Sequence, residues 1–142
     1  MVQTSGALSG RGERILYVDD EPLLVPVVER QLSLAGYAVT GYTNPHDALE
    51  AFKREPDAFA LVITDLSMPG MNGLELATEL RRLRPDTAII LSSGYLRPGV
   101  AEQASAIGIR AVLNKADSVD ELVPLVARVL AERAGPTTSS KA

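Results

Sequence analysis

Three aspartates stand directly after apolar runs, where their carboxylates could do chemistry. Asp19 and Asp20 follow residues 15–18. Asp65 follows residues 60–64 and precedes a turn rich in proline and glycine. Apolar runs of this length are typical of strands buried on both faces. If the two strands are parallel neighbours, their carboxyl ends bring the three carboxylates to the edge of the sheet where open α/β folds bind ligands.

Carboxylates at such an edge suit phosphoryl transfer. A carboxylate can attack phosphorus and become an aspartyl phosphate where cations neutralise the charge of the transferred group. Mg²⁺ is the usual cation, and Asp19, Asp20 and Asp65 could supply its oxygen ligands. Lys115 ends the last apolar run and would add a second positive charge. Ser93 offers a hydroxyl that can donate to a phosphoryl oxygen.

Each of these groups also has a purely structural interpretation. Asp20 could cap the turn that leads into the first helix, and Asp65 could be an Asx-turn residue. Lys115 could be a solvated loop lysine, and Ser93 an ordinary hydroxyl at the end of a strand. The combination favours a site, because four strands in the required order each place the needed group at the same end.

Five apolar, β-branched runs predict the strands that position these groups. They cover residues 15–18, 37–42, 59–64, 87–92 and 109–113. The run 37–42 is the weakest, which predicts an edge strand. Because helical patterns alternate with the runs, we predict a parallel sheet with helices on both faces and right-handed crossovers. Residues 1–12 and 134–142 lack periodicity and are predicted to be flexible tails of one domain at 13–133.

The helices have recognisable ends. Their expected bounds are 22–36, 44–52, 73–84, 98–108, and from 118 past 129. Asn44 is expected to cap the second helix, and Gly108 to end the fourth in a left-handed conformation. Ser118 and Glu121 form a capping box for the last helix. Because Pro124 lies too deep for a first-turn proline, we expect that helix to start later or to be kinked.

The composition excludes several classes of function. The 142 residues suit one domain, and the absence of cysteine excludes disulfides and thiolate metal sites. The formal net charge is −4, from 14 basic and 18 acidic residues, without a basic stripe, so we expect no nucleic-acid binding. No apolar run approaches the roughly 18 residues that span a bilayer, so we expect no membrane segment and a cytoplasmic protein.

From about residue 14 to residue 131, the chain resembles the receiver domain of bacterial two-component response regulators. The resemblance lies in the sequence Val-Asp-Asp-Glu at 18–21, in Thr-Asp-Leu-Ser-Met-Pro-Gly-Met-Asn-Gly at 64–73, in Ser-Gly at 93–94, and in Lys115. It implies an α/β, flavodoxin-like (βα)₅ three-layer sandwich whose five-stranded parallel sheet has the order 2-1-3-4-5.

The resemblance also implies a role for each site residue. Asp65 would accept a phosphoryl group from a kinase histidine, Ser93 would be the switch hydroxyl, and Lys115 would be the charge partner of the phosphoryl group. The implied partners are a histidine kinase or phosphotransfer protein and an unknown downstream protein. That protein would bind the surface of the fourth helix, the fifth strand and the fifth helix.

Mg²⁺ is the implied cofactor. It would be held by Asp20, Asp65 and the backbone carbonyl of Ser67, with Asp19 assisting through water. The implied protein is not an enzyme beyond its own phosphorylation and dephosphorylation, and it is a monomer or a phosphorylation-dependent dimer. The sequence leaves open whether the chain is free-standing or part of a hybrid sensor kinase, and we expect no DNA-binding output domain after Ala131.

Two positions depart from the receiver pattern. Receivers usually carry proline after the lysine, commonly in a cis bond, and this chain has Ala116 there. A trans bond is expected, because a cis bond to a non-proline residue costs about 2.5–4 kcal/mol; Lys115 or the last helix could then shift. Many receivers place an aromatic switch residue where this chain has Val112. We therefore hypothesise that the signal passes through residues 94–96, where Tyr95 could substitute in part, and the fourth helix.

Two alternative functions remain open from the sequence. The receiver fold could serve as a binding module that has lost efficient phosphorylation. An aspartate-nucleophile phosphohydrolase of the haloacid dehalogenase kind would use a similar sheet, but such enzymes carry a second aspartate where this chain has Ser67. His46 is expected to cap or decorate the second helix, far from the reactive edge. The segment 10–12 (Gly-Arg-Gly) precedes a strand and lacks a third glycine, so we discount it as a phosphate loop.

Overall fold

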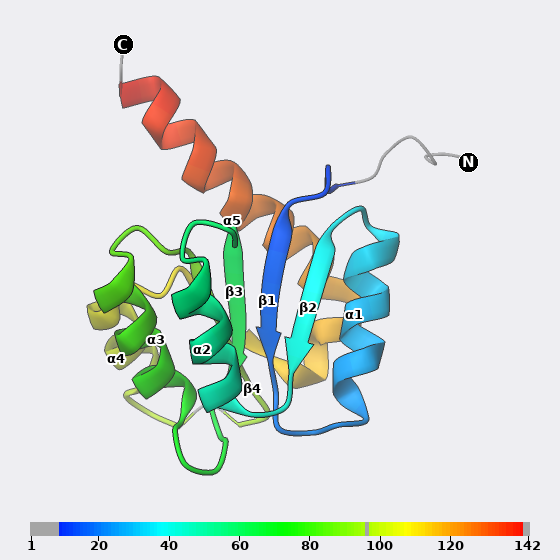
Figure 1. Ribbon diagram of the computed structural model, residues 1–142, viewed down its shortest axis with the longest axis vertical. Helices are drawn as coiled ribbons and strands as arrows, with labels where there is room; N and C mark the ends of the chain where they lie inside the picture. The colour runs from blue at the N-terminus through cyan, green and yellow to red at the C-terminus, as the bar shows by residue number, and fades with distance from the viewer. Residues whose placement is uncertain (1–8, 96, 141–142) are drawn as a thin grey trace.

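The computed structural model describes residues 9–95 and 97–140, in which strands and helices alternate (Figure 1). The strands are β1 (Arg14–Val18), β2 (Ala38–Tyr42), β3 (Leu61–Asp65), β4 (Ile89–Ser93) and β5 (Ala111–Asn114). The helices are α1 (Leu24–Leu34), α2 (Pro45–Arg54), α3 (Gly73–Leu83), α4 (Val100–Ile107) and α5 (Ser118–Ser140). A 3₁₀ turn, Lys115–Asp117, joins β5 to α5.

The strands form one parallel sheet in the order β2-β1-β3-β4-β5. The predicted flavodoxin-like fold is therefore confirmed, including the edge position of β2. Val18 of β1 pairs with Thr64 of β3, and Asp65 pairs with Ser92 of β4. This register puts the ends of β1, β3 and β4 side by side, which places their terminal polar residues at one edge.

Helices cover both faces of the sheet. Successive strand residues point to opposite faces, so the apolar residues of each strand form one cluster on each side. Leu16 and Val18 of β1 belong to a buried cluster with residues of α2, α3 and α4. Ile15 and Tyr17 belong to a second cluster with residues of α1 and α5. Every residue of β3 and β4 is buried, as their continuous apolar runs predict.

Three expected helix ends are found in the structure. The Asn44 side chain accepts hydrogen bonds from the backbone N–H groups of the first turn of α2. Asn72 and Glu75 form a capping box at the start of α3, which sets the turn between Asp65 and that helix. Gly108 ends α4 with φ +101°, a left-handed conformation that costs glycine little.

The described part of the first predicted tail, residues 9–12, contacts the rest of the domain. Within residues 9–12, the Gly10 N–H donates to the Ala35 carbonyl at 2.8 Å and the Gly12 N–H to the Gly36 carbonyl at 2.7 Å. Gly10 is buried, and the approach is close enough that a Cβ at this position would lie 2.6 Å from the Tyr37 ring. This short part of the predicted tail is therefore packed on the turn between α1 and β2. Residues 1–8 lie outside the described part of the chain.

The last helix differs from the sequence-based expectation at its start and covers part of the predicted tail. α5 starts at Ser118, so of the two alternatives expected from Pro124 the later start is wrong, and a kink stays a prediction. Pro124 is exposed, where water can bind the carbonyl that loses its helical partner. α5 also continues to Ser140, past residue 134, where a flexible tail is predicted. A single proline weakens a helix without always ending it, and residues that favour helix carry α5 as far as Ala134. The side chains of 117–119 and 133–140, including the predicted Ser118 cap, lie outside the description.

Within residues 9–95 and 97–140, no helix combines the length and the hydropathy that crossing a bilayer requires.

Candidate functional site

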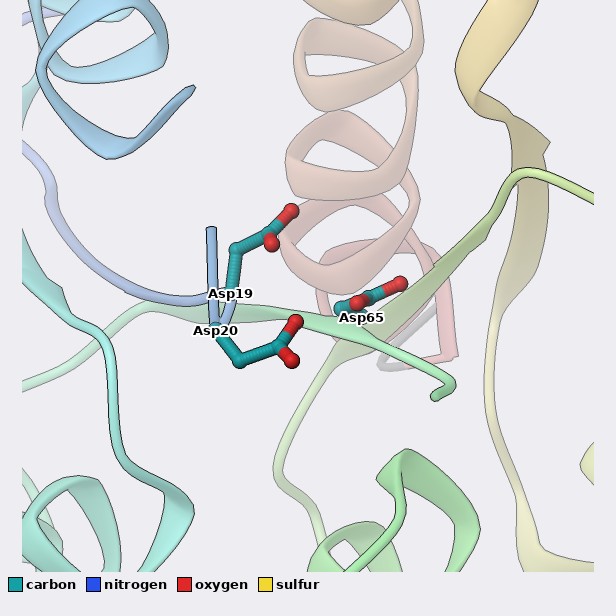
Figure 2. Close-up of side chains that lie close together, drawn as sticks. All are labelled: Asp19, Asp20 and Asp65. Atoms are coloured by element: carbon teal, nitrogen blue, oxygen red, sulfur yellow. The ribbon is translucent and has the colours of Figure 1, made fainter. Parts of the chain in front are cut away.

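Three carboxylates meet at the carboxyl edge of the sheet (Figure 2). Asp19 and Asp20 follow β1 directly, and Asp65 is the last residue of β3. One carboxylate oxygen from each residue lies within 4.8 Å of the others. Asp19 and Asp65 are buried, whereas Asp20 is partly exposed. Three acidic groups this close repel one another, so the cluster requires positive charge.

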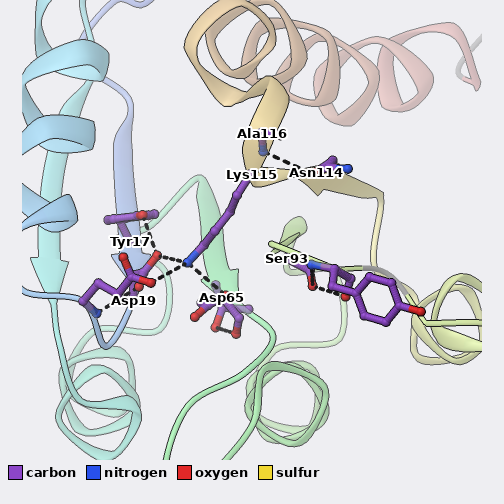
Figure 3. A network of polar contacts seen from close by, with 10 residues as sticks. Tyr17, Asp19, Asp65, Ser93, Asn114, Lys115 and Ala116 are labelled. Carbon is purple, nitrogen blue, oxygen red and sulfur yellow. Dashed lines mark hydrogen bonds and ion pairs between the residues drawn. The ribbon is translucent and has the colours of Figure 1, made fainter.

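Lys115 supplies that charge from the end of β5, at the same edge of the sheet (Figure 3). Its ammonium lies 2.8 Å from Asp19 Oδ2 and 3.3 Å from Asp65 Oδ1. A third carboxylate, that of Glu21, is 3.9 Å away. The side chain therefore extends from the end of β5 past β4 to reach β3 and β1. Lys115 bridges the two buried aspartates and holds their like charges together.

Asp19 is the most completely bonded of the acidic groups. Its Oδ1 accepts the Glu21 N–H at 3.0 Å, and its Oδ2 accepts the Tyr17 hydroxyl at 3.0 Å as well as Lys115. Sequence reasoning missed Tyr17. The signal was its position two residues before Asp19, since residues i and i+2 of an extended strand share a face.

Burial and charge shift the proton affinities of this cluster. Burial, and next the charge of Asp19, raise the pKa of Asp65 to about 6, although Lys115 opposes the change. Burial alone would lower the pKa of Lys115, but its hydrogen bond to Asp19 and the charges of Asp19 and Asp65 outweigh burial and raise it. Burial, followed by Asp19, raises the pKa of Tyr17 far above its ordinary value, so the phenol is a hydrogen-bond donor at neutral pH.

Ser93 ends β4 at the same edge, but its hydroxyl faces its own loop. The Ser93 hydroxyl donates to the Tyr95 carbonyl at 2.7 Å, and the Tyr95 N–H donates to Ser93 Oγ at 3.2 Å (Figure 3). Tyr95 is 71% exposed. A hydroxyl in this arrangement must leave the Tyr95 carbonyl before it can donate to a group on Asp65.

An open hollow of about 500 Å³ lies above these groups. Its lining includes Asp65, Ser93 and Lys115, together with the exposed Ser67 that follows β3. Arg97 also lines it, and no motif in the sequence pointed to that residue. The hollow gives a small anionic group access to the carboxylate of Asp65.

Comparison with known proteins identifies the family. A sequence profile of the response regulator receiver domain matches residues 15–127. The chain belongs to the response regulator receiver domain family. This receiver domain is 31% identical over 118 residues to the response regulator receiver protein CpdR of Brucella abortus, and the match covers 83% of this chain and 97% of CpdR.

A solved receiver has the same fold at higher identity. The response regulator protein TrrA of Thermotoga maritima, solved in complex with Mg²⁺ and BeF, is 33% identical, with a TM-score of 0.73. The alignment covers 82% of this chain and 98% of that protein. The C4-dicarboxylate transport transcriptional regulatory protein DctD of Rhizobium meliloti is 31% identical, but this chain spans 25% of its length. The receiver domain therefore matches one part of that longer protein.

Receiver domains are the phosphoacceptors of two-component signalling. They interact with histidine kinases or phosphotransfer proteins, and they are signalling modules rather than enzymes. They bind Mg²⁺ through acidic residues, and the cluster of this receiver fits that ion, because carboxylates are hard oxygen ligands. The partly exposed Asp20, beside the hollow, leaves room for the waters that Mg²⁺ retains.

The departure at Ala116 has a visible local consequence. The bond between Lys115 and Ala116 is trans, as are the other peptide bonds of the described residues. The Ala116 N–H, which a proline would lack, donates to Asn114 Oδ1 at 2.9 Å. Lys115 still reaches both aspartates, so the trans loop does not draw it away. Val112 is half-buried and packs against the buried cluster that includes residues of α4, so the position that many receivers fill with an aromatic ring holds an aliphatic side chain.

His46 lies beside the loop that follows β3, and it is not among the residues that line the hollow at Asp65. α2 starts just after the carboxyl end of β2, and a Cβ at Gly70 would lie 3.5 Å from His46 Nε2. Gly70 belongs to the loop that follows Asp65. The backbone N–H of His46 donates to Asn44, so the residue forms part of the cap of α2 as predicted.

Proposed function

We propose that Asp65 of this receiver domain accepts a phosphoryl group from a histidine of a kinase or phosphotransfer protein. The observation that supports this role most strongly is the position of Lys115, 3.3 Å from a buried carboxylate beside an open hollow. In the transfer, a carboxylate oxygen of Asp65 forms a bond to phosphorus while the bond from phosphorus to the histidine nitrogen breaks. The imidazole leaves with the electron pair of that bond.

The acidic cluster would hold Mg²⁺. We assign the metal to Asp20, Asp65 and the backbone carbonyl of Ser67, with Asp19 acting through water. When bound, Mg²⁺ supplies positive charge beside the phosphoryl oxygens. Asp19 is a poor direct ligand, because both of its oxygens already accept hydrogen bonds and it is fully buried.

Lys115 and Ser93 would respond to the new phosphoryl group. Lys115 follows the added negative charge, and Ser93 leaves the Tyr95 carbonyl to donate to a phosphoryl oxygen. The loop after β4 then loses the bond that holds its present conformation. We propose that this change passes to α4 and is read by a downstream protein on the surface of α4, β5 and α5, in the cytoplasm.

Intact mass measures the proposed chemistry directly. The protein is mixed with acetyl phosphate and Mg²⁺, as wild type, as Asp65→Asn and as the control Asp57→Asn, whose side chain is 97% exposed. We expect a gain of one phosphoryl group in the wild type and the control, and none in Asp65→Asn. A phosphorylated Asp65→Asn would refute the site assignment. An unmodified wild type would favour a binding module that has lost phosphorylation.

A further inference from the structure

Tyr17 is a buried side chain that links the core to the site. The residue lies in β1 and is 3% exposed, and its ring packs in the cluster that β1 forms with α1 and α5. Its hydroxyl lies at the border of this apolar cluster and donates a hydrogen bond to Asp19 Oδ2 at 3.0 Å (Figure 3). The ring is enclosed and the strand fixes its direction, so the hydroxyl has little freedom to turn elsewhere.

The same oxygen of Asp19 has a second donor. Lys115 lies 2.8 Å from Asp19 Oδ2 and is shared with Asp65 at 3.3 Å. Asp19 is therefore held by a mobile cation and a fixed hydroxyl at one oxygen, and by the Glu21 N–H at the other. Lys115 is the only one of these donors that phosphoryl transfer would draw away.

We propose that Tyr17 is a positioning residue for phosphoryl transfer: its hydroxyl holds Asp19 in place when Lys115 moves to the phosphoryl group. The inference rests on the proposed function of Asp65. A carboxylate that is 0% exposed cannot recover a lost donor from bulk water. With Tyr17 present, Oδ2 keeps one hydrogen bond after Lys115 leaves. Without it, Oδ2 would keep no side-chain donor among the described residues and would depend on the water through which Asp19 is proposed to act on Mg²⁺.

This assignment predicts a loss confined to the phosphoryl-bound state. In the resting state Lys115 satisfies Asp19 Oδ2, so removal of the Tyr17 hydroxyl has a small effect there. In the phosphoryl-bound state a buried charge is left short of a donor, and binding of a phosphoryl analogue should weaken roughly tenfold, in line with the value of a hydrogen bond to a charged group. A purely structural role would affect both states alike.

Beryllofluoride, which stands in for the phosphoryl group, provides the test. Its affinity in the presence of Mg²⁺, and the affinity of Mg²⁺ alone, are measured from amide chemical shifts for wild type, Tyr17→Phe and Tyr37→Phe. Tyr37 is the matched control, because it is a buried tyrosine at the opposite end of the sheet, against Gly10. We expect Tyr17→Phe to lose about tenfold in beryllofluoride affinity and at most about twofold in Mg²⁺ affinity, with Tyr37→Phe close to wild type.

Other outcomes overturn the proposal. Equal losses of both affinities in Tyr17→Phe would show a structural role only, and no loss would show that the hydroxyl is dispensable. A wild type that does not bind beryllofluoride would refute the proposed function and this inference with it. If Tyr17→Phe does not fold, isotope-labelled tyrosine rings in the wild type decide. The Tyr17 ring signal must then shift on beryllofluoride binding while that of Tyr37 stays unchanged, and an unshifted Tyr17 signal contradicts the proposal.

Discussion

On one side of Asp65, Lys115 already lies within 3.3 Å of the carboxylate and is held there by Asp19. On the other side, Ser93 reaches the same edge of the sheet, but its hydroxyl donates a hydrogen bond to the Tyr95 carbonyl at 2.7 Å. The two sides thus differ in whether their side chain already contacts Asp65. The charged side is assembled before any phosphoryl group arrives, whereas the hydroxyl side must first break a bond within its own loop.

The difference has an electrostatic origin. Buried carboxylates cannot remain unpaired, so Asp19 and Asp65 hold Lys115 in the resting state. Ser93 is neutral, and a neighbouring backbone carbonyl satisfies its hydroxyl at little cost. A phosphoryl group therefore meets a prepared site for its charge and a loop with an alternative conformation. We infer that the charged side serves transfer and that the hydroxyl side serves the signal.

Replacement of Lys115 tests the charged side with the largest expected effect. Lys115→Ala should slow phosphorylation by acetyl phosphate by roughly a hundredfold, because a preorganised cation next to the developing charge is lost. The rate is measured by intact mass over time at a fixed Mg²⁺ concentration. Lys53→Ala, which removes an exposed helical lysine paired with Glu50, is the control and should match the wild type. A Lys115→Ala rate close to that of the wild type would show that the prepared cation is not used.

The raised pKa of Asp65 predicts a pH-dependent free energy of unfolding. With a pKa of about 6 in the folded state, above the ordinary value of 3.8, the folded protein binds more protons than the unfolded chain between these values. The free energy of unfolding therefore falls as the pH rises from about 4 to about 6, and the full cost persists above that range. Asn cannot ionise, so Asp65→Asn should be more stable than the wild type by up to about 3 kcal/mol at pH ~7.5 without Mg²⁺.

Denaturant unfolding of both proteins across this range checks the prediction. The difference between Asp65→Asn and the wild type should shrink as the pH falls from ~6 to ~4 and disappear below pH ~3, where the wild-type carboxyl is protonated in both states. The exposed Asp57→Asn variant should show no such trend. A constant difference at every pH would mean that the substitution acts through packing rather than through the charge beside Asp19.

The loop that carries Lys115 gives the smallest expected effect. Asn114→Ala removes the acceptor of the Ala116 N–H and should lower the free energy of unfolding by about 1 kcal/mol, the net value of one hydrogen bond. Gln103→Ala on the exposed face of α4 is the control and should change it by less than about 0.5 kcal/mol. Denaturant midpoints measure both. An unchanged midpoint for Asn114→Ala would show that this hydrogen bond does not stabilise the trans loop.

Strand ends were predictable from the sequence, and contacts between side chains were not. The runs before Asp19, Asp65 and Lys115 indicated the sheet, because buried parallel strands are continuously apolar. Once the strand order is known, the meeting of these residues follows. The bond between Ser93 and Tyr95 depends on loop conformation, which residue types do not determine.

Other features missed by sequence analysis have similar causes. The hydrogen bond of the Tyr17 hydroxyl was not predicted, because tyrosine in an apolar strand pattern indicates only a core residue. The place of His46 near Gly70 follows from the loop after β3, whose path the motif alone does not describe. The extension of α5 to Ser140 was missed because glycine and proline at 135 and 136 are typical of a helix end.

The most direct test of the difference between the two sides is the amide shift of Tyr95 when Mg²⁺ and beryllofluoride bind. The account predicts a large change, because the Tyr95 N–H loses its present partner when the Ser93 hydroxyl turns toward the bound group. In Ser93→Ala the Tyr95 amide shift of the unbound protein should already differ from that of the unbound wild type. Binding of Mg²⁺ and beryllofluoride to this variant should then change the shift little. A Tyr95 amide that stays unchanged in the wild type while the site is occupied would contradict the account, because the signal would then not begin at Ser93.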